Sequence, residues 1–153
     1  LKFSIFLVLF TVGSGAFVSG TNAGWAYNNF PYMGDNILPP ILLEEDYNSI
    51  SKLFNDIGFI QFFHRIMATL TLFYVLATFF YLFKSKLRAL FVLSLIVTFV
   101  VIGQYLLGVI MLRLYVPIPL GLAHQLGSLI LLTTLIITKC EVMKRRAINR
   151  PSF

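Results

Sequence analysis

Two histidines are the residues of this chain best suited to bind a cofactor, because each lies inside a long apolar stretch. An ionisable group within a membrane helix is costly and usually serves a function. His64 lies in the apolar stretch 57–83, seven residues after Ile57. His124 lies in the apolar stretch 119–138, seven residues after Pro117. If the two stretches run in the same direction, both imidazoles lie roughly 10 Å below one membrane surface. Two histidines at equal depth on parallel helices suit the axial positions of a heme iron.

Small residues at helical spacing from the histidines would leave room for a flat ring system. They are Gly121, Gly127 and Ser128 beside His124, and Ala68 and Thr71 beside His64. Arg65 follows His64 directly and would lie close to the membrane surface. Its guanidinium could form a charge-assisted pair with a heme propionate. The pattern therefore favours His64 and His124 as metal ligands and Arg65 as a third heme-binding residue.

Other roles remain open for the same histidines. Each imidazole could instead only form hydrogen bonds between helices. A structural zinc site would need further ligands at the same depth, and a proton relay would be expected to include a carboxylate within the membrane. The apolar stretches contain neither. The single cysteine, Cys140, excludes an internal disulfide and a cysteine-based metal site, and we interpret it as a small residue at a helix end.

The composition is typical of a membrane protein. Of the 153 residues, 58% are hydrophobic and 12% are charged, and the mean hydropathy is +0.86. Soluble domains carry about 25% charged residues, and disordered chains are far less hydrophobic. The isoelectric point near 9.7 would be compatible with nucleic-acid binding, but in a membrane protein basic residues mark loops on one side. We therefore expect the chain to lie in a lipid bilayer and to bind no nucleic acid.

Four apolar stretches are each long enough to cross a membrane, at about 20 residues per span. They cover residues 3–20, 57–83, 89–112 and 119–138, and the longest connection is a loop at 21–56. Backbone groups in lipid must be satisfied internally, so we predict an all-α membrane protein with a bundle of four transmembrane helices. A signal peptide is the alternative for the first stretch. Gly13, Ala16 and Gly20 form a small-residue stripe there, which favours a resident helix that packs against a neighbour.

The charges orient these spans in the membrane. Nine of the twelve basic residues lie on one side, at Lys2, in the 84–88 connection and in the tail from 139. The 21–56 loop carries five acids and one base, Lys52. The positive-inside rule places both termini on the cytoplasmic or matrix side and the long loop on the opposite side. In this orientation the two histidine-bearing stretches are parallel.

Three segments together resemble the heme A synthase family of mitochondrial type. They are GAFVSGTNAG at 15–24 followed by YNNFPYMG at 27–34, QFFHR at 61–65, and VPIPL at 116–120 leading into the HQ pair at 124–125. Members of that family have eight transmembrane helices in two pseudo-symmetric halves, and they oxidise a methyl group of heme O to the formyl group of heme A. In the family the C-terminal half holds a heme b between two histidines. The N-terminal half holds the substrate heme and a catalytic glutamate.

The resemblance covers the C-terminal half, so it implies one half of an eight-helix fold with His64 and His124 as axial ligands of heme b. The catalytic glutamate of the family belongs to the other half and has no counterpart in this chain, so we assign no catalytic residue to it. Phe63 stands where some mitochondrial relatives have an acidic residue. With Phe63 at this position, no neighbouring carboxylate is expected to support His64. Iron ligation by His64 itself is still expected.

We therefore predict the heme b-binding half of a heme A synthase, an oxidoreductase of cytochrome oxidase assembly. It would be active only together with a separate N-terminal half, and its partners would be that half or other membrane subunits. The alternative is a catalytically inactive heme-binding or structural subunit associated with a respiratory complex, and a membrane scaffold without a cofactor is a further alternative. The expected location is the mitochondrial inner membrane, with the bacterial plasma membrane as the alternative.

Overall fold

The computed structural model of the chain describes residues 1–43, 50–84 and 87–148. Within these residues, four helices are long and apolar enough to cross a membrane. They are α1 (Lys2–Gly20), α3 (Ile57–Phe83), α4 (Arg88–Arg113) and α5 (Ile118–Ile148). A short helix α2 (Ile50–Asn55) and the 3-10 turns η1 (Ala23–Trp25) and η2 (Pro40–Leu42) lie in the connection between α1 and α3. The predicted bundle of four membrane helices is confirmed.

Local chemistry explains several of the helix boundaries. Asp56 precedes α3, and its Oδ1 accepts a hydrogen bond of 2.6 Å from the backbone N–H of Phe59, which is a helix N-cap. Pro119 lies in the first turn of α5, where its missing N–H leaves no helical bond unmade. At its other end α5 continues beyond the apolar stretch to Ile148. Arg145 Nε and Glu141 Oε1 form an ion pair of 2.7 Å across one turn, which supports this charged extension.

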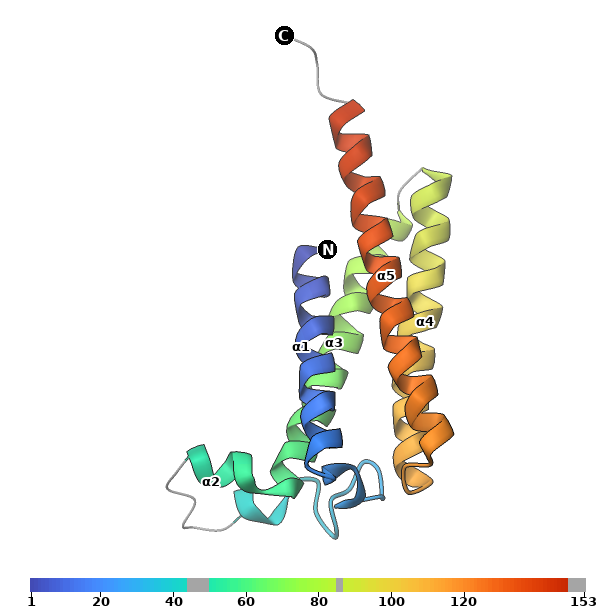
Figure 1. Cartoon of the computed structure of the whole chain (residues 1–153). Coiled ribbons are helices and arrows are strands. Elements are labelled where there is room, and N and C mark those ends of the chain that lie inside the picture. Colours follow the sequence, from blue (N-terminus) through green and yellow to red (C-terminus); the bar gives the residue numbers. More distant parts are fainter. Residues whose placement is uncertain (44–49, 85–86, 149–153) are drawn as a thin grey trace.

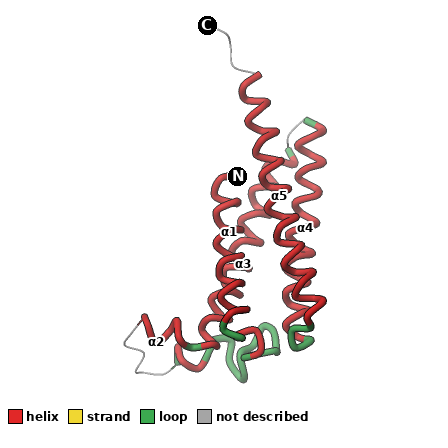
Figure 2. Tube along the Cα trace, in the orientation of Figure 1, coloured by secondary structure: helices red, strands yellow, loops and turns green. Residues whose placement is uncertain are grey.

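The four long helices form a ring in which α1 packs on α3, α3 on α4, α4 on α5, and α5 on α1 (Figure 1). Helices α3 and α5 consequently occupy diagonal positions. Both run from the end of the bundle with the α1–α3 loop, here called the outer end, toward the end with the chain termini, here called the inner end (Figure 2). Helices α1 and α4 run the opposite way, so the two histidine-bearing helices are parallel, as predicted.

The tightly packed core of the bundle lies toward the inner end. It consists of Val8, Val75, Phe79, Val97, Val101, Leu131 and Leu135, which come from all four long helices. Around the two histidines the packing is looser: none of the residues is buried in the described segments 9–20 of α1, 62–70 of α3, 102–111 of α4 and 118–130 of α5. We call this part of the bundle the histidine layer. Its side chains make fewer dispersion contacts with one another than those of the core.

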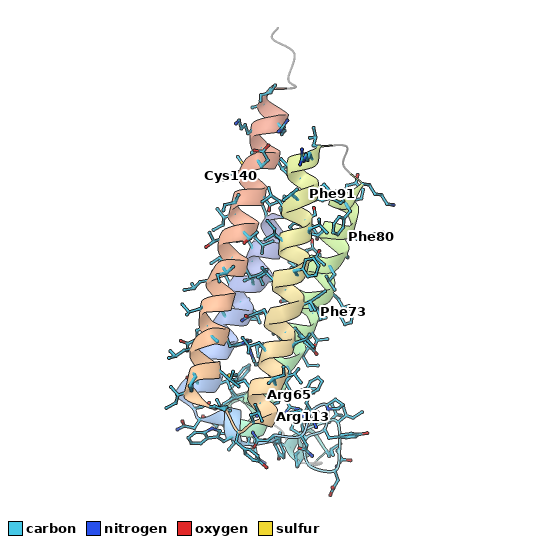
Figure 3. All side chains as sticks on the ribbon, turned by 90° about the vertical axis from the view of Figure 1, so that its right-hand side faces the viewer. Arg65, Phe73, Phe80, Phe91, Arg113 and Cys140 are labelled. Atoms are coloured by element: carbon cyan, nitrogen blue, oxygen red, sulfur yellow. The ribbon has the colours of Figure 1, made fainter. Side chains whose placement is uncertain are left out.

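Large apolar side chains cover the outside of the bundle. Phe73, Phe80 and Phe91 project away from the helices (Figure 3), and they are 65%, 67% and 43% exposed. Such a surface suits contact with lipid chains. Phe79 is instead fully buried in the core. The adjacent residues Phe79 and Phe80 therefore have different roles: Phe79 packs in the core, and Phe80 faces outward, where it can contact lipid.

The first part of the outer loop folds against the outer end of the bundle. Gln61 Nε2 donates a hydrogen bond of 3.2 Å to the carbonyl of Gly24, and Asn28 Nδ2 donates one of 2.8 Å to the carbonyl of Leu112. These bonds connect the loop to α3 and α4. The loop therefore lies directly beside the histidine layer.

Candidate functional site

His64 is held between α3 and α1. Its ring lies against Gly15 of α1, where an added Cβ would come within 3.0 Å of the imidazole Cε1. Its Nδ1 lies 2.8 Å from the hydroxyl oxygen of Ser14. Glycine at this position lets the α1 backbone approach the ring closely, and the Ser14 hydroxyl meets one of the two ring nitrogens. The other nitrogen, Nε2, remains available for a ligand.

His124 has a closely similar setting between α5 and α4. Its ring lies against Gly108 of α4, where an added Cβ would come within 2.9 Å of the imidazole Cε1. Gln104, one turn earlier on α4, donates a hydrogen bond of 2.6 Å from Nε2 to the His124 carbonyl. The Nδ1 atom of His124 is buried without a hydrogen-bond partner.

The bundle thus contains the same arrangement twice. In each helix pair, α1–α3 and α4–α5, a histidine of one helix packs its Cε1 edge on a glycine of the other. The two histidines lie on diagonal helices, and each ring packs on a different neighbouring helix, α1 for His64 and α4 for His124. Each of the two diagonal helices thus carries one imidazole that could serve as an axial ligand.

The glycines that contact the histidines differ from those singled out in the sequence. Gly127 faces Gln104, whose side-chain oxygen lies where a Cβ would be, and Gly121 faces the Met111 sulfur. The predicted recess beside His124 is therefore filled on these sides by α4 side chains. Ser128 donates a hydrogen bond of 2.7 Å to the Gln125 carbonyl of its own helix.

Gly15 and Gly108 were missed because helical spacing relates residues of one helix only. Thr71, also predicted beside His64, shares a hydrogen bond of 2.7 Å with Thr11 and thereby joins α3 to α1. No sequence periodicity indicates which glycine of a neighbouring helix will meet a given histidine.

The donor set fits a heme iron better than a bare metal ion. Among the described residues there is no group of three or more His, Cys, Asp or Glu side chains that could hold a metal. A zinc ion needs at least three protein ligands, whereas a porphyrin supplies four nitrogens and leaves two axial positions. Two histidines in a loosely packed layer match that requirement.

Arg65 lies at the outer end of the same layer (Figure 3), and its guanidinium binds the outer loop. Its N–H groups donate hydrogen bonds to the carbonyls of Tyr27 (2.8 Å), Tyr32 (3.1 Å) and Pro31 (3.4 Å) and to Gln61 Oε1 (3.1 Å). The guanidinium carbon also lies 5.7 Å from the centre of the Phe30 ring. Its Nε is buried without a partner. Arg65 therefore organises the loop next to the histidines, and its contact with a heme propionate stays a prediction.

The fold and this site define an integral membrane protein with one potential axial ligand on each of two parallel, diagonal helices. The sequence profile of the family described as "Cytochrome oxidase assembly protein" (COX15-CtaA) matches residues 1–136. The chain belongs to this family, and the resemblance inferred from its motifs is confirmed.

Individual relatives agree with the family match. The chain is 35% identical over 143 residues to a heme A synthase of Wolbachia sp. subsp. Brugia malayi, which covers 92% of this chain and 40% of the relative. It is 38% identical over 137 residues to the heme A synthase COX15 of Homo sapiens, with 83% of this chain and 31% of the relative covered. The chain thus spans well under half the length of these curated relatives. No solved structure matches it.

Proposed function

We propose that this chain is the heme b-binding half of a heme A synthase, with His64 and His124 as the axial ligands of the iron. The observation that carries this proposal is the repeated histidine–glycine packing on two parallel, diagonal helices. Family membership supports heme as the group, because the relatives are named heme A synthases. In this reading the chain contributes to heme A biosynthesis for cytochrome oxidase.

The two proposed axial histidines determine the chemistry that the heme would supply. A heme with both axial positions filled by protein supplies one-electron transfer when bound, because no position is left for oxygen. The residues of this chain would hold the ring, set its depth, and shield its outer edge with the loop that Arg65 binds. Arg65 would also place positive charge near the propionates. The oxidation of the heme O methyl group would take place elsewhere.

The catalytic part would therefore come from a second polypeptide or segment. The matched region accounts for 40% or less of each relative described above, so those proteins contain additional sequence that this chain does not match. We propose an N-terminal half, or other membrane subunits, as the partner that completes an eight-helix fold. The mitochondrial inner membrane is the proposed location, and a bacterial plasma membrane is the alternative.

A heme-binding subunit without catalytic activity is the second candidate. It is favoured by the absence of Asp and Glu from helices α1, α3 and α4 and from α5 before Glu141. A chain with this composition has no membrane carboxylate to act in an oxidation. Such a subunit would keep the electron-transfer heme and associate with a respiratory complex.

Optical spectroscopy of the purified chain tests heme ligation directly. We expect a sharp reduced α band from a low-spin heme, and we expect His64→Ala and His124→Ala each to abolish it or convert the heme to high spin. Thr133→Ala, which removes an exposed polar group of α5, is the matched control and should keep the full band. A double His64→Ala, His124→Ala variant with an unchanged low-spin spectrum would refute the proposal.

Coexpression with the N-terminal half of a relative separates the two candidates. Conversion of heme O to heme A by the combined halves, measured by chromatography of extracted hemes, supports a half-enzyme. Heme binding without any conversion by a complex that has assembled supports the inactive subunit.

A further inference from the structure

The hydroxyl group of Ser14 connects His64 to the backbone of α1. Ser14 Oγ donates a hydrogen bond of 2.7 Å to the Thr11 carbonyl, and the same oxygen lies 2.8 Å from His64 Nδ1. A carbonyl can only accept, so the single hydroxyl proton of Ser14 is used in the bond to Thr11. With that proton donated to Thr11, the contact with His64 is a hydrogen bond only when the imidazole carries its proton on Nδ1. In the neutral imidazole this leaves the lone pair on Nε2.

We propose that Ser14 is a positioning residue that holds His64 as its Nδ1–H tautomer and strengthens Nε2 as an iron ligand. The inference rests on the proposed heme ligation. A hydrogen bond from the second ring nitrogen fixes the tautomer and orientation of a ligating histidine and raises its basicity. The Ser14 oxygen is itself polarised, because its proton is donated to Thr11, and such chains strengthen each bond.

The other histidine has no side-chain partner of this kind. The position equivalent to Ser14, directly before the contact glycine, is Leu107 in α4. Leucine cannot accept a hydrogen bond, and His124 Nδ1 is buried without a partner. The two histidines therefore differ at Nδ1 despite their similar packing, with a serine hydroxyl beside His64 Nδ1 and no side-chain partner at His124 Nδ1.

The midpoint potential of the bound heme measures the donor strength of its axial ligands. A more basic ligand stabilises ferric over ferrous iron, so Ser14→Ala should shift the potential to a more positive value. Heme retention should fall by roughly 10-fold, the lower end of the usual effect of such supporting residues. The heme should stay low-spin because both histidines remain. Ser14→Thr keeps the hydroxyl and should restore the parent potential.

Two further variants make the test specific. Ser19→Ala removes an exposed serine from the same helix and should leave the potential and heme retention unchanged. Leu107→Ser places a hydroxyl at the equivalent position beside His124, and it should shift the potential in the opposite direction, to a more negative value.

The outcomes separate this inference from the heme assignment. If His64→Ala abolishes the low-spin heme but Ser14→Ala has the same potential and heme retention as Ser19→Ala, the role of Ser14 is refuted and ligation stands. If Ser14→Ala fails to fold, a parent-like potential in Leu107→Ser counts against the tautomer argument, and the negative shift supports it. A low-spin heme that persists in His64→Ala overturns both proposals.

Discussion

Replacing Gly108 by alanine should displace the His124 imidazole from its position in the bundle. The added Cβ would lie 2.9 Å from the ring Cε1, whereas carbon atoms in favourable contact are about 3.5–4.0 Å apart. The ring or helix α4 must therefore move by roughly 0.6–1 Å. The imidazole is planar, so it can relieve the clash only by moving as a whole, which changes the position of its nitrogens.

The expected effect on heme binding follows from the cost of overpacking. The Gly108–His124 contact is close even though the layer around it is loosely packed, and forcing a carbon into such a contact costs roughly 1–3 kcal/mol. If the displaced imidazole must return to its original place to bind iron, this cost appears in the affinity for heme. The affinity should then fall by roughly 5- to 150-fold, since about 1.4 kcal/mol corresponds to a factor of ten.

Gly103→Ala is the matched control, because Gly103 lies on the same helix and an added Cβ there meets nothing within 4 Å. Alanine favours a helix over glycine by about 1 kcal/mol, and this gain is common to both variants. Titration of the apoprotein with heme, followed by the low-spin band, gives the two affinities. Equal heme affinity in Gly108→Ala and Gly103→Ala would show that the close glycine contact does not position His124.

Three more outcomes follow from the same geometry. Gly15→Ala should weaken the His64–heme bond and lower the affinity for heme. Gly13→Ala, whose Cβ meets nothing within 4 Å, should leave the affinity unchanged. Equal affinities of the two variants would contradict the packing of His64 on α1. Arg65→Ala should keep the low-spin band but weaken heme retention and expose the 21–43 loop to protease. The reason is the loss of charged hydrogen bonds that contribute about 1.5–3 kcal/mol each. A loop that is cut no faster than in the parent would refute this expectation. The exposed Cys140 should react with a membrane-impermeant thiol reagent only from the side of the termini, and labelling from the loop side would reverse the proposed topology.

Hydropathy predicted the four helices, because a membrane imposes a minimum length and an internally bonded backbone on each span. The neighbours of the histidines could not be predicted in the same way. Gly13 and Gly15 are two residues apart in α1, yet only Gly15 contacts an imidazole. This difference depends on the rotation of α1 against α3, which is determined by side-chain packing rather than by the composition of either helix.

Arg65 illustrates a second limit of the sequence argument. Its depth was predictable from its position after His64, but its loop partners were not, because backbone carbonyls carry no residue-specific pattern. Four hydrogen-bond acceptors reach its guanidinium, and three of them are carbonyls of the 27–32 segment. Only the folded loop shows that the Arg65 side chain binds these carbonyls, and its contact with a heme propionate stays a prediction.

The repetition of one histidine and one glycine in each helix pair has a consequence for assembly. A heme bound to both imidazoles would join the α1–α3 pair to the α4–α5 pair and would add a cross-link at the outer end, beyond the core that the four helices share. Binding to the folded state alone adds about 2.7 kcal/mol of stability when free heme is at 100 times its dissociation constant. The apolar core near the inner end can hold the hairpins together without that link, but the histidine layer has no buried residue to do so. Amide hydrogens of the outer turns should therefore exchange much faster in the apoprotein than those of the inner turns, and heme loading should slow them selectively.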